Sequence, residues 1–214
     1  MSGDVKRGQP SQGRREQART RLARRAVVAA ARTLFLERGY GTTTIEDIGN
    51  LGDVPPATIY RLFASKLGIL KALLDTSIAG DDEPLTVQER PNVASLFAEP
   101  DPIKLLTGFA DVTTAINQRT QDVYRVLVSA AGSDPAAAEL LDEVQQQRSR
   151  GQSQIARALA RSGSLRDGLP EHDAADLIHA LMSPEVYRLL VVDRNWPPGK
   201  YQRWLGATLI QQLT

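Results

Sequence analysis

The feature that most constrains the fold of this 214-residue chain is the helical spacing of its apolar residues. Within residues 14–38, Val27, Ala31, Leu34 and Phe35 follow one another at positions i, i+4, i+7 and i+8, which places them on one face of a helix. No segment shows the alternation of apolar and polar residues that predicts a strand. The sequence therefore predicts an all-α protein.

Two short helical segments follow this first helix, and a tight turn separates them. Thr43 and Glu46 have the spacing of a capping box, so we expect them to start the first segment. Gly52 and Asp53 end it, and Pro55-Pro56 begins the second segment, because proline is tolerated in the first turn of a helix. This is the layout of a helix-turn-helix motif, although an ordinary helical hairpin shares it.

The remaining sequence predicts further helices. Ser65 is placed to cap a fourth helix that reaches about residue 79. Residues 80–102 contain four prolines, so we expect a connector with one short helix at 91–98. A kink or a new start capped by Ser183 is expected at Pro184. The other helices are expected near 102–118, 121–132, 135–162, 172–193 and 199–213.

Charge is divided unevenly along the chain. Residues 1–71 contain 13 Lys and Arg against 6 Asp and Glu, whereas residues 72–214 contain 13 against 19. Such a split is typical of a basic module that meets a polyanion, joined to a body that does not. We therefore divide the chain into a disordered basic arm at 1–13, a helix-turn-helix domain at 14–71 and a helical body at 72–214.

The segment from Arg25 to Leu70 resembles the DNA-binding signature of the Tet-repressor family. That signature has the form AA-x-x-LF-x-x-x-GY, then TT-x-x-x-I, a turn, and T-x-Y-x-x-F-x-SK. The matching residues keep the order and spacing of the signature; they are Ala30-Ala31, Leu34-Phe35, Gly39-Tyr40, Thr43-Thr44, Ile48, Val54, Thr58-Ile59-Tyr60, Phe63 and Ser65-Lys66.

The resemblance implies an N-terminal three-helix DNA-binding domain and a larger helical domain that binds an effector and dimerises. It also implies which residues touch DNA. Threonines at a helix N-terminus, Tyr60 and Lys66 suit phosphate contacts, and the start of the second short helix suits base contacts. The expected DNA-contacting residues are Thr43, Thr44, Pro56, Ala57, Thr58, Tyr60, Arg61 and Lys66.

Three positions depart from the family pattern. Asp53 replaces the turn glycine, Pro55 replaces the usual serine cap, and Leu62 replaces the common histidine. Asp tolerates a left-handed conformation, so the turn survives. The groove-facing start has no hydrogen-bonding side chain before Thr58, so we expect base reading to use apolar contacts with thymine methyls together with Thr58 and Arg61.

The N-terminal arm leaves two interpretations open. Its basic residues, Lys6, Arg7, Arg14, Arg15 and Arg19, either contact phosphates or the minor groove, or belong to a solvated tail. The basic stretch continues directly into a patterned helix, so we expect no cleaved leader.

Expectations for the body rest on apolar patterning and on the resemblance. Candidate effector-pocket residues, mostly apolar, are Phe97, Phe109, Tyr124, Ile155, His179 and Met182. Candidate dimer-interface residues lie on the last two helices, where core packing within one subunit is an equally good explanation. These residues are Leu177, Leu181, Leu189, Trp204 and Leu209.

The expected function is a DNA-binding transcriptional regulator. It would be a homodimer that represses transcription and leaves a palindromic operator when a small, mainly apolar effector binds. A regulator without an effector is the alternative. A helical enzyme is disfavoured because no phosphate loop, nucleophile elbow or metal cluster occurs. The chain has no cysteine and no long apolar run, so we expect no metal, cofactor or membrane span, and a cytoplasmic location.

Overall fold

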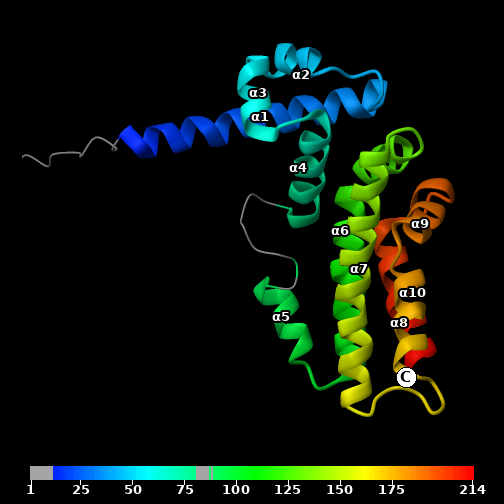
Figure 1. Ribbon diagram of the computed structural model, residues 1–214. Helices are drawn as coiled ribbons and strands as arrows, with labels where there is room; N and C mark the ends of the chain where they lie inside the picture. Colours follow the sequence, from blue (N-terminus) through cyan, green and yellow to red (C-terminus); the bar gives the residue numbers. More distant parts are fainter. Residues whose placement is uncertain (1–11, 81–86, 88) are drawn as a thin grey trace, which may run out of the picture. The chain divides into compact units, whose positions relative to one another are not determined.

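The computed structural model describes residues 12–80, 87 and 89–214, with side chains from residue 16 onward, so the arm expected at 1–13 lies almost wholly outside the described residues. Every regular element in this described part is helical, which confirms the all-α class (Figure 1). The elements are α1 (Gln12–Arg38), α2 (Ile45–Gly52), α3 (Pro56–Phe63), α4 (Lys66–Ala79), α5 (Pro91–Phe97), α6 (Pro102–Ala131), α7 (Pro135–Arg161), α8 (Glu171–Leu181), α9 (Pro184–Tyr187), the π-helical η1 (Arg188–Asp193) and α10 (Pro198–Leu213).

The chain forms two compact units, which meet within α4 between Leu73 and Leu74. In the first unit α2 and α3 pack on the second half of α1. Its core is apolar and is built from all three helices and the turns between them. The buried residues include Val27, Ala31, Leu34, Phe35, Ile45, Ile48, Val54, Ile59 and Phe63.

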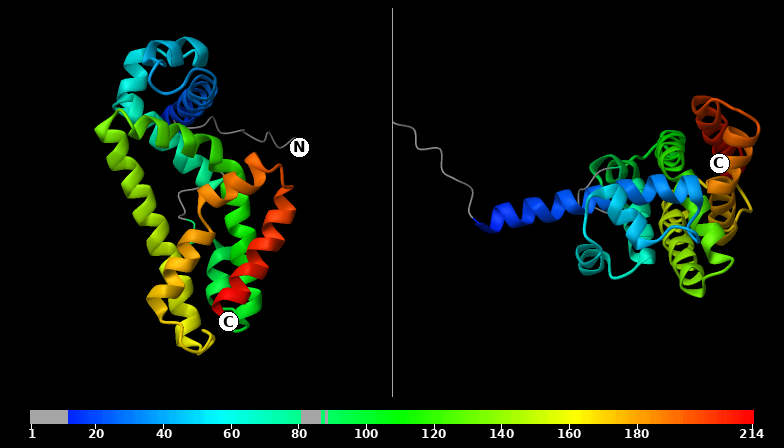
Figure 2. Two further views of the ribbon diagram at one scale, coloured as in Figure 1. Left: turned by 90° about the vertical axis from the view of Figure 1, so that its right-hand side faces the viewer. Right: turned by 90° about the horizontal axis from the view of Figure 1, so that it is seen from above.

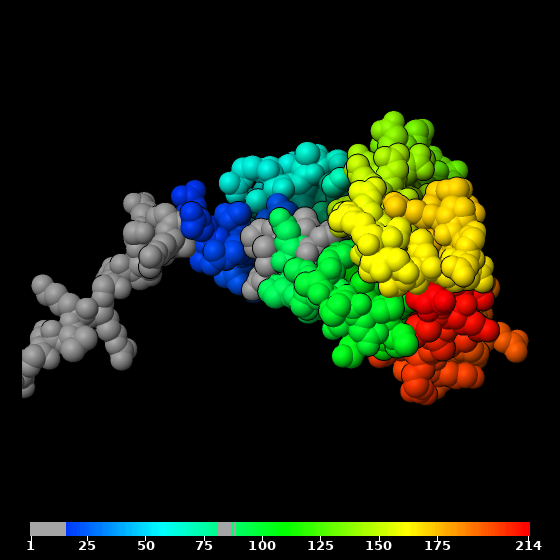
Figure 3. Space-filling model, turned by 90° about the horizontal axis from the view of Figure 1, so that it is seen from below, coloured from blue at the N-terminus to red at the C-terminus, as the bar shows by residue number. Residues whose placement is uncertain are grey.

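The second unit is a bundle in which α6 packs against α7 and α10, and α7 packs against α8 (Figures 1 and 2). Its apolar core includes Leu106, Phe109, Ile178, Leu205 and Leu209. The end of α10 lies against the connection that follows α7, where the Arg166 amide donates a 2.8 Å hydrogen bond to the Leu213 carbonyl (Figure 3).

One helix prediction for this unit is wrong. The segments expected at 102–118 and 121–132 form one continuous helix, α6. Its buried face carries polar residues at Thr113, Asn117 and Thr120, and the Thr120 hydroxyl donates 2.8 Å to the Ile116 carbonyl of its own helix. Because those buried positions are not apolar, the pattern suggested an interruption that the backbone does not make.

The predicted restart near Pro184 is confirmed. Instead of one helix over 172–193, α8 ends at Leu181 and α9 begins at Pro184. The Ser183 hydroxyl caps α9 by accepting a 3.1 Å hydrogen bond from the Val186 amide. The next six residues continue as the π-helical η1.

Candidate nucleic-acid interface

Helix α3 presents one face to the core of the first unit and the other to solvent. Ile59 and Phe63 are buried, at 0% and 7% exposure. Tyr60 is 51% exposed, and Arg61 is exposed beside it. The start of the helix is also on the surface, because Pro55, Pro56 and Ala57 are exposed and Thr58 is half-buried. The exposed face is thus available for a groove of DNA.

The turn between α2 and α3 is held by a left-handed residue and a close backbone approach. Asp53 has φ 51° and ψ 44°, as expected for the residue in the place of the family's turn glycine. The Val54 amide donates a 3.0 Å hydrogen bond to the Gly49 carbonyl. A Cβ on Gly49 would lie 2.7 Å from the Val54 oxygen, so only glycine permits this turn. The sequence reasoning did not single out Gly49.

The predicted cap of α2 is wrong by one residue. The N-cap is Thr44, whose hydroxyl accepts a 3.0 Å hydrogen bond from the Asp47 amide, while the Asp47 carboxylate accepts one from the Thr44 amide. The Thr44 hydroxyl also lies 2.8 Å from the Asp47 carboxylate and donates to it, and this hydrogen bond, followed by the one from the Thr44 amide, lowers the pKa of Asp47. Thr44 is exposed, and it remains a candidate for a phosphate contact at the N-terminus of α2.

Thr43 has a different role from the one expected. It is 1% exposed, and its hydroxyl donates a 2.8 Å hydrogen bond to the Gly39 carbonyl. The side chain therefore fixes the connection between α1 and α2 and does not face DNA.

Lys66 also departs from its expected role. Its ammonium donates hydrogen bonds of 2.7 Å to the Tyr40 carbonyl and 2.9 Å to the Thr43 carbonyl, and it lies 4.3 Å from the centre of the Tyr40 ring. An ammonium has only three donors, and these contacts engage it within the first unit. Lys66 therefore joins α4 to the α1–α2 connection, which is a positioning role.

Arg24 of α1 is a second positioning residue, and the sequence reasoning missed it. Its guanidinium donates a 3.0 Å hydrogen bond to the Leu62 carbonyl and lies 4.6 Å from the centre of the Phe63 ring. These contacts tie α1 to the last turn of α3. The contact spans 38 residues of sequence, so no local pattern could have indicated it.

In the second unit the six expected effector-pocket residues lie in two places. Phe109, Ile155 and Met182 belong to the apolar core, and Phe97 packs against it with its ring centre 5.0 Å from that of Phe109. Tyr124 lies fifteen residues after Phe109 on the same helix, about 22 Å along its axis. The expected residues are therefore spread along the bundle, and their contact with an effector stays a prediction.

Tyr124 and His179 belong to a partly buried polar cluster that also contains Arg148, Gln152 and Glu185. The Tyr124 hydroxyl and the Glu185 carboxylate oxygen are 3.1 Å apart, and Arg148 Nη1 donates to the His179 carbonyl at 3.2 Å. Arg148 Nη2 lies 2.9 Å from His179 Nε2, and His179 Nδ1 lies 2.8 Å from Gln152 Oε1. Arginine cannot accept a hydrogen bond, so Nε2 is the acceptor and Nδ1 carries the proton.

The polar cluster disfavours the protonated form of His179. Burial lowers the pKa of His179, and the positive charge of Arg148 lowers it further. Burial also raises the pKa of Tyr124. The cluster joins α6, α7, α8 and the start of α9, which is where facing helices of a bundle can build a polar site.

The five expected dimer-interface residues differ in their exposure. Leu189 is 49% exposed, whereas Leu177, Leu181 and Trp204 are partly buried against the core. Leu209 is 0% exposed within a single subunit, so it belongs to the core and not to an interface.

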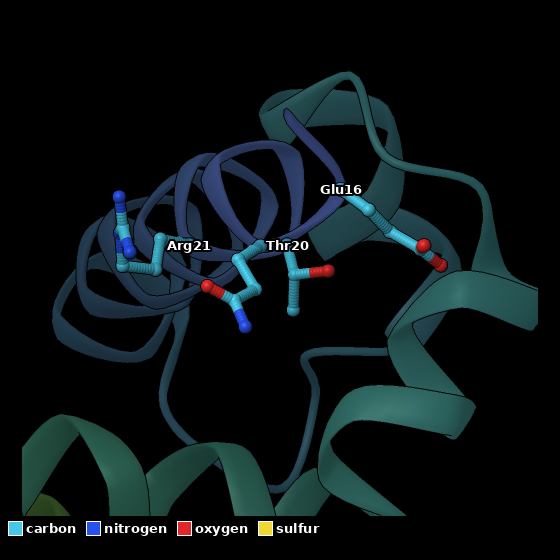
Figure 4. Close-up of a pocket in the computed structure, with 4 residues that line it drawn as sticks. Glu16, Thr20 and Arg21 are labelled. Carbon is cyan, nitrogen blue, oxygen red and sulfur yellow. The ribbon is translucent and has the colours of Figure 1, made fainter. Parts of the chain in front are cut away.

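An open hollow lies along the first turns of α1, lined by Glu16, Gln17, Thr20 and Arg21 (Figure 4). None of the six expected effector residues lines it, and the residues that do include both an acidic and a basic side chain. Among the described residues, no group of acidic or histidine side chains could hold a metal ion, and no helix is long and apolar enough to cross a membrane.

Comparison with known proteins agrees with this geometry. Residues 27–73 match the family model described as bacterial regulatory proteins, tetR family. The chain is 25% identical over 182 residues to an uncharacterized HTH-type transcriptional regulator, YdeS, of Bacillus subtilis, covering 84% of each chain.

Solved structures share the fold. The fatty acid degradation regulator FadR from Bacillus halodurans matches with a TM-score of 0.67 and 15% identity, over 88% of this chain and 94% of that one. A tetR-family regulatory protein from Rhodococcus RHA1 matches with a TM-score of 0.64 and 19% identity, over 89% and 96%.

Proposed function

The chain belongs to the tetR family of bacterial regulatory proteins, and on that premise we propose that it is a homodimeric repressor that reads a palindromic operator through α3. The observation that carries this proposal is the two-faced burial of α3. Ile59 and Phe63 hold the helix in the core, while Tyr60 and Arg61 stay exposed. A helix held along one face and open along the other is what entry into a major groove requires.

Contacts along this face divide into two kinds. Thr44 and Tyr60 carry hydroxyls that suit phosphates, which fix the position of the protein without reading sequence. Pro56, Ala57 and Thr58 lie at the start of α3, where a recognition helix meets base edges. Two of these three side chains are apolar, so thymine methyls are the groups they suit best, with Thr58 and Arg61 supplying hydrogen bonds.

Two copies of this reading surface would match a palindrome. We place the dimer contact on the apolar residues of α8, η1 and α10 that remain on the surface of one subunit. Leu189 is the most exposed of the expected residues, and Leu177 and Trp204 are partly exposed. A two-fold interface brings the same surface of both subunits together, so the two α3 helices take symmetric positions on the operator.

Release of the operator by a small molecule is the regulatory part of the proposal. The polar cluster around Tyr124, Arg148 and His179 supports an effector that carries a hydrogen-bonding group, in addition to the apolar body expected from the sequence. Among the structural neighbours, one was solved as a SmeT–triclosan complex and another in complex with choline.

Helix α4 offers a physical route for this release. At its first residue Lys66 bonds the α1–α2 connection, and near its last turn Arg119 of α6 donates hydrogen bonds of 3.2 Å and 3.0 Å to the Ser77 and Ile78 carbonyls. A ligand that shifts α6 would shift the end of α4 and favour one of two dimer states. A regulator without an effector is the remaining alternative, and it predicts that no ligand changes the affinity for DNA.

Selection of bound duplexes from a random DNA library tests the function. We expect enrichment of a palindromic sequence rich in thymine at the positions facing α3, with two protein chains bound per duplex. A library that shows no enrichment, or a single chain bound per site, contradicts the proposal. Addition of a compound library to the complex then separates the two forms of regulation, because only an effector-controlled repressor is released.

A further inference from the structure

The N-terminal half of α1 has no core to pack on. Among residues 16–26, none is buried, and the first fully buried side chain of the helix is Val27. Leu22 is 64% exposed. The helix nevertheless begins at Gln12, so residues 12–25 form an extension of about 21 Å at 1.5 Å per residue. Figures 1 and 2 show this extension running past α2 and α3 on one side.

The α1 extension is strongly basic. It contains six arginines and a single acidic residue, Glu16. Arg21 and Arg25 are four residues apart, which places like charges next to each other on the helix. A helix of this length is marginal without packing, and such pairs weaken it further. The net positive charge of the extension complements the negative charge of a polyanion.

The contacts of Arg24 fix where the extension begins. Its guanidinium donates a hydrogen bond to the Leu62 carbonyl at the end of α3 and covers the Phe63 ring, so the extension begins beside the last turn of the recognition helix. We therefore expect a duplex bound to α3 to continue past the extension. Its length of about 21 Å corresponds to about six base pairs at 3.4 Å each.

We propose that the α1 extension is a second DNA-contacting element, which binds phosphates of the duplex outside the base pairs read by α3. This inference rests on the proposed function, because it assumes that α3 faces the operator. Two observations carry it: the charge of the extension, which complements the phosphate backbone, and its continuity with the recognition helix through Arg24. Such contacts add affinity without reading base sequence.

Duplexes of two lengths test the proposal directly. One contains only the selected palindrome, and the other adds about eight base pairs of arbitrary sequence at each end. We expect the wild-type protein to bind the longer duplex about tenfold more tightly at low salt. The double substitution Arg19→Ser with Arg21→Ser should remove most of this gain, flatten the dependence on salt for the longer duplex and leave affinity for the shorter one unchanged.

Two further variants make the result specific. Arg19→Lys with Arg21→Lys preserves the charge and should preserve the gain. Arg150→Ser with Arg161→Ser removes the same charge from exposed positions of α7 and should also preserve it. The proposal is overturned if the wild type gains nothing from the flanks, or if the serine variant keeps the full gain. Failure of the wild type to prefer the selected palindrome over shuffled DNA would instead count against the proposed function itself.

Discussion

The side-chain ammonium of Lys66 lies 2.7 Å from the carbonyl oxygen of Tyr40 and 4.3 Å from the centre of its ring. The same ammonium bonds the Thr43 carbonyl at 2.9 Å. A lysine at the start of a helix is unfavourable toward the helix dipole, so it needs a compensating interaction. Here the carbonyl oxygens of the α1–α2 connection supply that interaction, and the lysine holds α4 to the DNA-binding unit.

Replacement of Lys66 by methionine should therefore destabilise the protein and not alter the electrostatics of DNA binding. Loss of the charged hydrogen bonds should lower the free energy of unfolding by about 2 kcal/mol, measured by chemical denaturation. The slope of log affinity against log salt should stay nearly unchanged. Lys104→Met, at an exposed position of α6, is the control. If Lys66→Met instead flattened the slope of log affinity against log salt by about 0.9 and left stability unchanged, Lys66 would be a phosphate contact.

The Thr44–Asp47 capping box should make part of the stability depend on acid pH. The hydrogen bonds from Thr44 lower the pKa of Asp47, so the folded state favours the carboxylate. The contribution is present above the ordinary pKa of 3.8 and is lost as the pH falls through the lowered value. Thr44→Val should raise the pKa of Asp47 again, measured by NMR of the carboxyl carbon. Thr42→Val should leave it unchanged, and an equal shift in both variants would reject the capping box.

His179 should make stability fall at mildly acid pH. The folded state lowers its pKa from 6.5, so the unfolded chain binds the proton more readily. Stability is complete above pH 6.5 and decreases as the pH falls toward the lowered value. His179→Gln should reduce the dependence of the free energy of unfolding on pH, measured by chemical denaturation from neutral pH down through mildly acid pH. The chain's other histidine, His172, is exposed, and His172→Gln should change nothing.

Leu189→Asp should dissociate the dimer, because a carboxylate at the centre of an apolar interface loses its hydration. Ile103→Asp is the matched control, since Ile103 of α6 is similarly exposed, at 54% against 49%. Sedimentation at micromolar concentration distinguishes the two. Leu209→Asp is expected to unfold the subunit, because Leu209 is fully buried. A dimer that survives Leu189→Asp would place the interface elsewhere.

Sequence alone was sufficient for the helix-turn-helix because its signals are local. The left-handed Asp53, the start of α3 at Pro56 and the cap at Ser65 each follow from a few neighbouring residues. The one-residue error at the cap of α2 arose because Thr43 and Thr44 are adjacent threonines, and either hydroxyl could cap the helix. Only the fold shows that Thr43 turns inward to the Gly39 carbonyl.

Contacts between distant residues were beyond prediction. The Arg24–Leu62 and Lys66–Tyr40 hydrogen bonds join residues 38 and 26 positions apart, and no spacing rule selects those partners. The continuity of α6 was obscured because buried Asn117 and Thr120 look like surface residues. Arg148 and Gln152 of the polar cluster were missed for the same reason. They lie on the inward face of α7, but polar side chains in the sequence indicate a surface position.

The central claim is that the exposed face of α3 reads DNA sequence, and a competition between two duplexes tests it most directly. Wild-type protein and Thr58→Ala are titrated at one salt concentration with the selected palindrome and with a shuffled duplex of the same length. We predict that the wild type prefers the palindrome by about 1000-fold or more. Thr58→Ala should lose about 1–3 kcal/mol on the palindrome and little on the shuffled duplex. Equal affinity of the wild type for both duplexes would contradict the account.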